Sequence, residues 1–367
     1  MERGKAGESP SEYNRIAIET AQKIHAIRQS EGKRKPSFEP AREDHFPAFD
    51  RTGLGIILEY ERMGNRPVSE TLESEFQAQD YSLEHLGLTI GTVVRGIDLR
   101  TIDAAKAQLL RKLLLERKVI FFHEQNLDED QQVALGRHFG ELDAFPFGPP
   151  GENPYVLEIR HGRNSPGIEN RWHTDVTWME RPSLGSIAQC IHAPPFGGDT
   201  LFSDSYACYL GLRAELQDAI EHLDGVHDYR VFLSQRAPGT MPDHLLKQIQ
   251  EEIPFGVSHP LVRTHPETGR RALYLHGGFL RHNSLTDRRT GEVLDPKESR
   301  GLVRELLSQH ARPEYTCRFR WSQGSIAFWD NRAAQHYAVS DYFPHKRVLR
   351  RVTVSGDRPF YRPIPEN

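Results

Sequence analysis

The sequence predicts a mainly β fold with flanking helices, built on a double-stranded β-helix (jelly-roll) core. After residue 150, short β-type runs follow one another, among them VLEI, LGSIAQCI, TLFSD, ALYL, YTCRFRW, SIAFWD and RRVTVSG. Turns containing Gly and Pro separate these runs. Many short strands with a few outer helices favour a double-sheet jelly roll over a doubly wound sheet. No GxGxxG follows a strand and no GxxxxGK[ST] is present, so dinucleotide-binding and P-loop folds lack their signal.

The chain divides by composition into two parts. Residues 1–80 are polar, charged and dotted with prolines, and we expect an N-terminal extension that is partly helical and partly linker-like. Isoleucines at helical spacing predict a helix over about 12–29, and KRKPSFEPARED reads as linker. Residues 81–367 are expected to form the jelly-roll domain.

The first elements of that domain follow from hydrophobic periodicity. YSLEHLGLTIGTVVRGIDL predicts two short strands, and residues 102–117 place their apolar side chains on one helix face. VIFFHEQ predicts a buried strand, and 129–139 a second amphipathic helix. Further helices are expected near 207–223, 242–252 and 296–310.

Charge and cysteine content narrow the class of protein. The formal net charge of −4 supplies no basic field, so we expect no nucleic-acid partner. No run of 18 apolar residues occurs, and no membrane partner is expected. The three cysteines, Cys190, Cys208 and Cys317, are scattered and odd in number, which indicates reduced thiols in a cytoplasmic protein. We also expect a homo-oligomer.

The segment RWHTDVTW suggests a metal site. If it is a strand, His173 and Asp175 face the same side and can reach one ion. His336 is a candidate third ligand, and two imidazoles with one carboxylate leave open positions of the kind used by Fe(II) oxygenases. Composition alone gives about two or three His-x-acid pairs, so this pair is weak evidence by itself. We expect the pair His222/Asp224 to diverge at a helix end, and His265/Glu267 to be solvated.

Longer segments make the metal site specific. They are RWHTDVTWMERPSLGSIAQCIHAPPFGGDTLFSD, HPLVRTHPETGRRALYLHGGF and SIAFWDNRAAQHYAVSDYFPHKRVLRRVTVSGDRPFYR. In motif type, order and spacing, about residues 81–362 resemble the taurine dioxygenase/2,4-dichlorophenoxyacetate dioxygenase (TauD/TfdA) family. The resemblance implies a jelly-roll Fe(II), 2-oxoglutarate-dependent dioxygenase that uses O2 and releases CO2 and succinate. It implies iron ligation by His173, Asp175 and His336.

The resemblance also implies which residues bind the two organic anions. In the family, an arginine eleven residues after the distal histidine binds the far carboxylate of 2-oxoglutarate, and here this is Arg347. The family's threonine in the GGDT segment is Thr200. An arginine four residues further on, Arg351, corresponds to the one that binds the substrate anion in sulfonate and alkyl-sulfate members. Arg347 and Arg351 share a strand face, whereas Arg350 points to the other.

The remaining positions of the taurine pocket differ from the family pattern. Aligned pocket positions fall on Phe145, Gly148, Glu169, Phe232 and Leu233, and the later pocket phenylalanine is retained as Phe279. Each phenylalanine could equally be ordinary core packing. Mostly apolar replacements favour a larger, partly apolar anion over taurine. We therefore expect C–H hydroxylation of an alkyl sulfate or sulfonate, an aryloxyalkanoate or another organic acid.

Two other functions are compatible with the metal motif. A carnitine-pathway-type hydroxylase would act on a trimethylammonium substrate, but such enzymes carry an N-terminal zinc module, and no cysteine precedes Cys190. They also need an aromatic cage rather than Arg351. A non-catalytic metal-binding jelly roll would not need Arg347.

Overall fold

The structure is a computed structural model. It describes residues 55–144, 153–163, 165, 167, 169–233, 243–244, 247, 251 and 256–363, and the side chains of 232 and 233 fall outside the description. The helix expected over 12–29 and most of the one expected over 242–252 therefore lie outside the described residues. A compact unit runs from Ala48 to Asn367.

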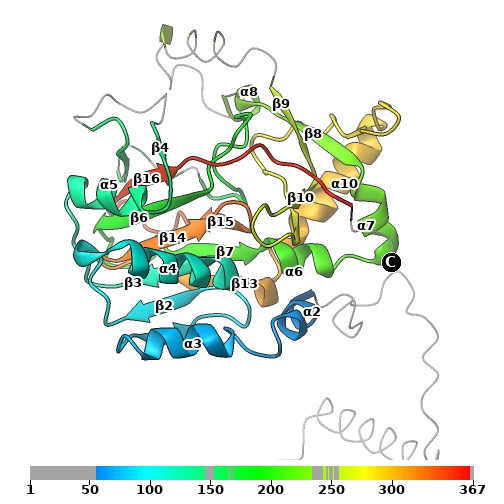
Figure 1. The fold of residues 1–367 in the computed structure, drawn as a ribbon. Coiled ribbons are helices and arrows are strands. Elements are labelled where there is room, and N and C mark those ends of the chain that lie inside the picture. The colour runs from blue at the N-terminus through cyan, green and yellow to red at the C-terminus, as the bar shows by residue number, and fades with distance from the viewer. Residues whose placement is uncertain are drawn as a thin grey trace, which may run out of the picture. The chain divides into compact units, whose positions relative to one another are not determined.

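The described part is mostly β, with several sheets and flanking helices (Figure 1). The largest sheet has eight strands in the order β1-β2-β3-β14-β6-β16-β4, with β5 also beside β16. All of its pairs are antiparallel except β2 with β3. Its strands are β1 (Ser82–His85), β2 (Thr92–Arg95), β3 (Val119–Phe122), β4 (Leu142–Asp143), β5 (Leu157–His161), β6 (Gly185–His192), β14 (Ile326–Asp330) and β16 (Arg347–Val354).

Three smaller sheets complete the β structure. One has the order β13-β7-β15, the second has the order β12-β8-β9, and β10 pairs with β11 as a hairpin. Their bounds are β7 (Thr200–Asp204), β8 (Leu223–His227), β9 (Val257–Pro260), β10 (Val262–Thr264), β11 (Arg271–Leu273), β12 (Thr286–Asp287), β13 (Thr316–Phe319) and β15 (Ala334–Ala338).

Aspartate side chains cap the N-termini of several helices. Asp103 accepts a hydrogen bond from Lys106 N at the start of α4, and Asp128 with Gln131 forms a capping box on α5. The helices are α2 (Gly55–Arg62), α3 (Glu70–Gln77), α4 (Ala104–Arg117), α5 (Glu129–Arg137), α6 (Ser205–Leu210), α7 (Ala214–Ile220), α8 (Tyr229–Leu233) and α10 (Pro296–Gln309), with 3-10 turns η3 (Leu99–Thr101) and η4 (Pro313–Tyr315). No described helix is long and apolar enough to span a bilayer.

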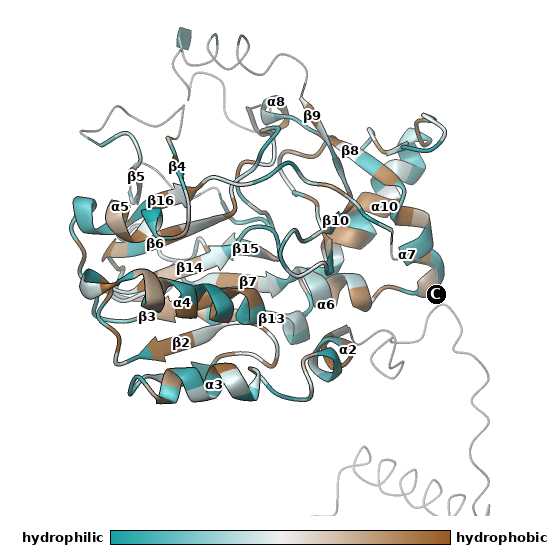
Figure 2. Cartoon of the chain, viewed as in Figure 1, coloured by the Kyte–Doolittle hydropathy of each residue, from teal (hydrophilic) through white to brown (hydrophobic). Residues whose placement is uncertain are grey.

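Alternating side chains of the large sheet divide the core into two layers. On β3, Ile120 and Phe122 face the cluster formed with α3, α4 and α5, whereas Phe121 faces the sheet β13-β7-β15. The Phe121 ring stacks on Phe319 of β13 with centroids 4.1 Å apart. Figure 2 shows the apolar colouring on the central strands and on parts of α4. The large sheet is thus covered by α3, α4 and α5 on one face and by the sheet β13-β7-β15 on the other.

Residues 55–80 contribute to this same core. Ile56 of α2, and Leu72 and Phe76 of α3, are buried among its apolar clusters. The Gly55 N–H donates to the hydroxyl of Tyr315 at 2.9 Å. The compact unit therefore includes a stretch that composition alone placed with the extension.

Candidate active site

Three side chains that the sequence predicts as ligands lie together between the sheets. One ligand atom each from His173, Asp175 and His336 lies within 4.8 Å of the others, and all three residues are buried. His336 lies on β15. The expectation that His173 and Asp175 share a strand is wrong: His173 makes an isolated bridge to His336, and Asp175 lies in the turn that follows. Val176 has φ +48°, a strained conformation for a β-branched residue, and the chain turns there.

Asp175 is held as an ionised carboxylate. Ser186 Oγ donates to its Oδ2 at 2.8 Å, and Arg351 Nη1 donates to its Oδ1 at 3.0 Å. Burial by itself would raise the pKa of Asp175, but the positive charge of Arg351 and the contributions of both imidazoles outweigh it, so the pKa is lowered. The carboxylate is therefore available as a ligand at neutral pH.

Both imidazoles are held in the neutral form that coordinates a metal. Burial lowers the pKa of His173 and lowers that of His336 well below its ordinary value, with His173 adding to the effect on His336. His173 Nδ1 lies 2.7 Å from the carbonyl of Arg171, which leaves Nε2 for an ion. His336 Nε2 lies 3.8 Å from Asp175 Oδ1. Two neutral nitrogens and one carboxylate oxygen fit Fe(II).

Asn331 ties this ligand segment to the turn between β14 and β15. Its Oδ1 accepts hydrogen bonds from Thr174 Oγ1 at 3.1 Å and Asp175 N at 3.3 Å. Trp329 Nε1 donates to the same oxygen at 2.9 Å, and Asn331 Nδ2 donates to Ser183 Oγ at 2.8 Å. The same turn leads into β15 and thereby fixes the position of His336.

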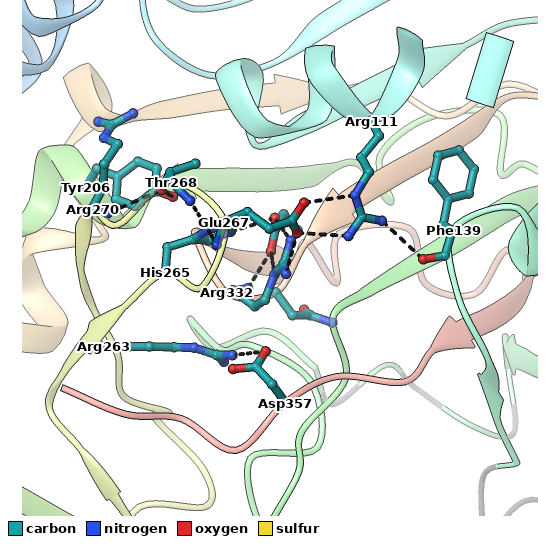
Figure 3. Close-up of polar contacts among 12 residues, drawn as sticks. Arg111, Phe139, Tyr206, Arg263, His265, Glu267, Thr268, Arg270, Arg332 and Asp357 are labelled. Carbon is teal, nitrogen blue, oxygen red and sulfur yellow. Dashed lines mark hydrogen bonds and ion pairs between the residues drawn. The ribbon is translucent and has the colours of Figure 1, made fainter. Parts of the chain in front are cut away.

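A buried cluster of ion pairs holds the turn between β14 and β15 in place (Figure 3). Asp330 accepts hydrogen bonds from Arg332 at 2.9 and 2.7 Å, and its Oδ2 lies 3.1 Å from His265 Nε2. Arg332 also pairs with Glu267, which binds Arg111 of α4. The expectation that His265 and Glu267 are solvated is wrong for His265, because it is only 1% exposed and belongs to this cluster. His222 lies between α7 and β8, and Asp224 lies on β8, where it pairs with Arg288.

The candidate ligands open onto a cavity of about 290 Å³. Polar side chains that line it are Glu169, Arg171, Thr200, His276, Arg347 and Arg351, besides the three candidate ligands. Its remaining wall is mainly apolar and aromatic and includes Leu157, Ile159, Val176, Trp178, Phe202, Tyr229, Phe279, Trp321, Trp329 and Leu349. The cavity can therefore hold a charged head group and an apolar body at once.

Arg347 and Thr200 form a candidate anion site in the cavity wall. Arg347 is 3% exposed, and its Nη2 donates to Thr200 Oγ1 at 3.3 Å. Trp321 Nε1 donates to the same oxygen at 2.9 Å. Because Thr200 Oγ1 accepts both hydrogen bonds, its own O–H is left to donate elsewhere. Arg347 Nε is buried and lacks a partner among the described residues. These groups suit a carboxylate.

Arg351 occupies the same face of β16 as Arg347, as the strand period predicts. Its Nε is also buried without a partner among the described residues, although Nη1 bonds Asp175. Arg350 points to the opposite face, where its Nε donates to Gln132 of α5 at 2.8 Å and its Nη2 donates to the carbonyl of Leu127. Arg347 and Arg351 therefore both line the cavity, whereas Arg350 does not.

The other predicted substrate residues have mixed outcomes. Phe279 and Glu169 line the cavity, and the Glu169 side chain is 36% exposed and lies 3.2 Å from His161 Nε2. Phe145 and Gly148 lie outside the described residues, as do the side chains of Phe232 and Leu233.

Some residues of the site were missed by the sequence analysis. Ser186 and Asn331 position Asp175, Trp321 supports Thr200, and His276 lines the cavity. Most of these contacts join residues far apart in the chain, so local patterns carry no signal for them. His276 lies in the YLHGGF motif, three residues before the expected Phe279. The two glycines that follow His276 were the only local sign that the chain makes a close turn there.

Comparison with known proteins agrees with this geometry. The family model for taurine catabolism dioxygenase TauD, TfdA family, matches residues 82–353. The alpha-ketoglutarate-dependent sulfate ester dioxygenase of Pseudomonas putida is 35% identical over 280 residues, which cover 74% of this chain and 88% of that protein. An alkylsulfatase of Acinetobacter baylyi is 32% identical over 284 residues, covering 76% of this chain and 86% of that one.

A solved structure shows the same fold. It is the crystal structure of a putative alpha-ketoglutarate-dependent taurine dioxygenase from Burkholderia xenovorans, with a TM-score of 0.65 and 35% identity. The match covers 77% of this chain and 94% of that one. With the ligand triad and the buried Arg347–Thr200 pair, these matches show that the chain belongs to the TauD/TfdA family of Fe(II)- and 2-oxoglutarate-dependent dioxygenases.

Proposed function

We propose that the protein hydroxylates a C–H bond of a small organic anion with an apolar body, and that an alkyl sulfate is the best candidate. The observation that carries the proposal is Arg351, a buried guanidinium that shares one cavity with Arg347 and is otherwise surrounded largely by apolar wall. Alkyl sulfonates and aryloxyalkanoates have the same general chemistry. A trimethylammonium substrate would meet a cation where it needs an aromatic cage.

The formal charges of the cavity support two anionic ligands. Arg171, Arg347 and Arg351 supply three positive charges, and Asp175 and Glu169 supply two negative charges. A divalent ion would bring the formal total to +3, which a 2-oxoglutarate dianion and one alkyl sulfate monoanion would balance. Buried charges need such partners, because an unpaired one costs several kcal/mol.

Each group has a role in this proposal. His173, Asp175 and His336 would hold Fe(II), and Arg347 with Thr200 would bind the far carboxylate of 2-oxoglutarate through a charge-assisted contact. Arg351 would bind the head group of the substrate, and Phe279 would contact its chain. When bound, Fe(II) with 2-oxoglutarate and O2 supplies the oxidising power for C–H hydroxylation and releases CO2 and succinate.

The chain's residues determine which carbon reacts. With the head group on Arg351, beside Asp175, the carbon next to it lies nearest the ligand triad. If that carbon bears the ester oxygen of a sulfate, the hydroxylated product loses the hydroxyl proton, its C–O bond breaks, and an aldehyde and sulfate leave. The aromatic wall excludes water around the reacting carbon.

Four finer features are part of the proposal. We infer that the large sheet and the sheet β13-β7-β15 form the double-stranded β-helix, since their facing side chains pack together around Phe121. We also propose a homo-oligomer, and an N-terminal extension before the jelly-roll domain, with residues 55–80 packed into the core of that domain. A cytoplasmic location is supported by three buried free cysteines.

Succinate release across four substrates tests the function. Taurine, hexyl sulfate, hexanesulfonate and an aryloxypropionate would be compared at steady state with excess Fe(II) and 2-oxoglutarate. Each methylene buried in the cavity should contribute about 0.8 kcal/mol, roughly fourfold, until the cavity is filled. We therefore expect hexyl sulfate to be turned over well and taurine poorly. Taurine as the best of the four substrates would contradict the proposal. Glu169 could also repel dianions or attract an amine, and Glu169→Gln would reveal either effect.

A further inference from the structure

His276 is a cavity residue with no role in the proposal above. It follows β11, is only 2% exposed, and its ring lies 5.3 Å from that of His173 between centroids. The ring also stacks on Phe279, with centroids 4.0 Å apart and 28° between the planes. The stacking limits how the imidazole can turn.

Backbone contacts determine which nitrogen of His276 carries the proton. The N–H of Gly278 lies 2.7 Å from Nδ1, and the N–H of Phe279 lies 2.9 Å from it. Both partners are obligate donors, so Nδ1 must present its lone pair. The ring is therefore neutral with its proton on Nε2. A side chain at Gly278 would come within 2.9 Å of Arg171 and 3.3 Å of His276 Cε1, so glycine permits this close loop.

The proton on Nε2 has no hydrogen-bond partner among the residues that the structure describes. His276 lines the cavity, and its Nε2 is buried without a hydrogen-bond partner among the described residues. Buried donors are nearly always paired, and leaving one unpaired costs roughly 1–3 kcal/mol. A nitrogen that carries a proton is no metal ligand. The unpaired donor thus indicates a ligand atom that accepts a hydrogen bond in the cavity.

We propose that His276 donates its Nε2–H to an oxygen of the substrate's anionic head group and thereby selects sulfate esters and sulfonates over carboxylates. The inference rests on the function proposed above. Arg351 bonds Asp175 and the ring of His276 lies beside that of His173, so the two donors that line the cavity neighbour different members of the ligand triad. A tetrahedral head group offers three terminal oxygens and can meet both. A planar carboxylate offers two, and a guanidinium fork uses both of them.

The test compares His276→Phe and His276→Asn with the wild type. Phe keeps an aromatic ring for stacking but removes both nitrogens. The Asn side chain has an oxygen that can accept the two backbone N–H groups and an amide that can donate. Binding of hexyl sulfate and hexanoate would be measured by titration into protein loaded with Mn(II) and N-oxalylglycine, which does not turn over. Steady-state kcat/KM for hexyl sulfate would be measured in parallel.

The expected result is specific to the head group. His276→Phe should weaken hexyl sulfate binding and lower kcat/KM about tenfold or more, the cost of a hydrogen bond to a charged group. Hexanoate binding, Mn(II) binding and the apparent constant for 2-oxoglutarate should change by no more than about twofold. His276→Asn should recover part of the loss.

Two results would overturn the inference, and they are distinguishable. If wild-type protein binds hexyl sulfate and His276→Phe binds it equally well, or loses hexyl sulfate, hexanoate and 2-oxoglutarate alike, His276 has only a structural role and the proposed function stands. If wild-type protein binds neither hexyl sulfate nor hexanoate, the proposed function fails and the inference about His276 fails with it.

Discussion

His173 and His336 exchange two backbone hydrogen bonds. The N–H of His173 donates to the carbonyl of His336 at 3.0 Å, and the N–H of His336 donates to the carbonyl of His173 at 2.7 Å. Their rings lie 4.0 Å apart between centroids. The spacing of the two candidate ligands is thus set by main-chain pairing and does not depend on their side chains.

The first prediction uses this pairing. We expect three variants to fold but to form no succinate and to bind Fe(II) weakly: His173→Ala, Asp175→Ala and His336→Ala. The reason is that two ligands hold a labile divalent ion poorly. Equilibrium dialysis and a succinate assay would measure both effects. His222→Ala, whose histidine does not line the cavity, is the control and should change neither. Full 2-oxoglutarate turnover by Asp175→Ala would show that the triad assignment is wrong.

The second prediction separates the arginines of β16. Arg347→Ala should raise the apparent constant for 2-oxoglutarate roughly tenfold to a hundredfold, because a charge-assisted contact contributes about 1.5–3 kcal/mol. Substrate affinity should change less. Arg350→Ala is the matched control, since that side chain faces α5 and should leave the constant unchanged. Equal 2-oxoglutarate affinity in Arg347→Ala and wild type would exclude the assigned role.

The third prediction concerns pH and Arg351. Its guanidinium is the main cause of the lowered pKa of Asp175, which burial alone would raise. Arg351→Ala should therefore raise that pKa, so that protons compete with the metal at higher pH. Mn(II) binding, titrated from pH 7 downward, should be lost at a higher pH in Arg351→Ala than in wild type. Arg351→Lys keeps a positive charge and should shift the curve less. Superimposable curves for Arg351→Ala and wild type would count against this electrostatic role.

Several parts of the fold and site could be predicted from local sequence. Strand alternation predicted that Arg347 and Arg351 share a face and Arg350 does not, and most of the expected strands and helices are confirmed. The family motifs predicted that His173, Asp175 and His336 lie together, and the structure places them so.

Other features depend on contacts that no local pattern records. His265 looked solvated because it precedes a proline and a turn, but Asp330, 65 residues away in sequence, draws it into the core. The segment with Asp175 looked like a strand, but Asn331 and the main-chain bridge to His336 turn it at Val176. For His265, the long-range contact with Asp330 outweighs the preference of a polar side chain for solvent.

The last prediction tests the buried ion pair between Asp330 and Arg332 at the turn between β14 and β15. Asp330→Asn should lower the free energy of unfolding by about 3–5 kcal/mol, because it leaves the buried guanidinium of Arg332 short of a counter-charge. It should also weaken Mn(II) binding, since Asn331 in the same turn holds Thr174 and Asp175. Urea unfolding and metal titration would measure the two effects. Asp287→Asn removes an exposed ion pair with Arg289 and should change stability much less.

The pH dependence of this difference has a definite sign. Burial would raise the pKa of Asp330, but Arg332 and His265 lower it far below its ordinary value. In the unfolded chain, the pKa of an aspartate is about 3.9. The stability that Asp330 contributes is therefore fully present above that pH and is lost as pH falls toward the folded-state pKa. The gap in unfolding free energy between wild type and Asp330→Asn should stay constant from pH 7 to about pH 5 and narrow below about pH 4. A gap that widened on acidification would mean that Asp330 is protonated in the folded protein and that its ion pair with Arg332 does not hold the turn.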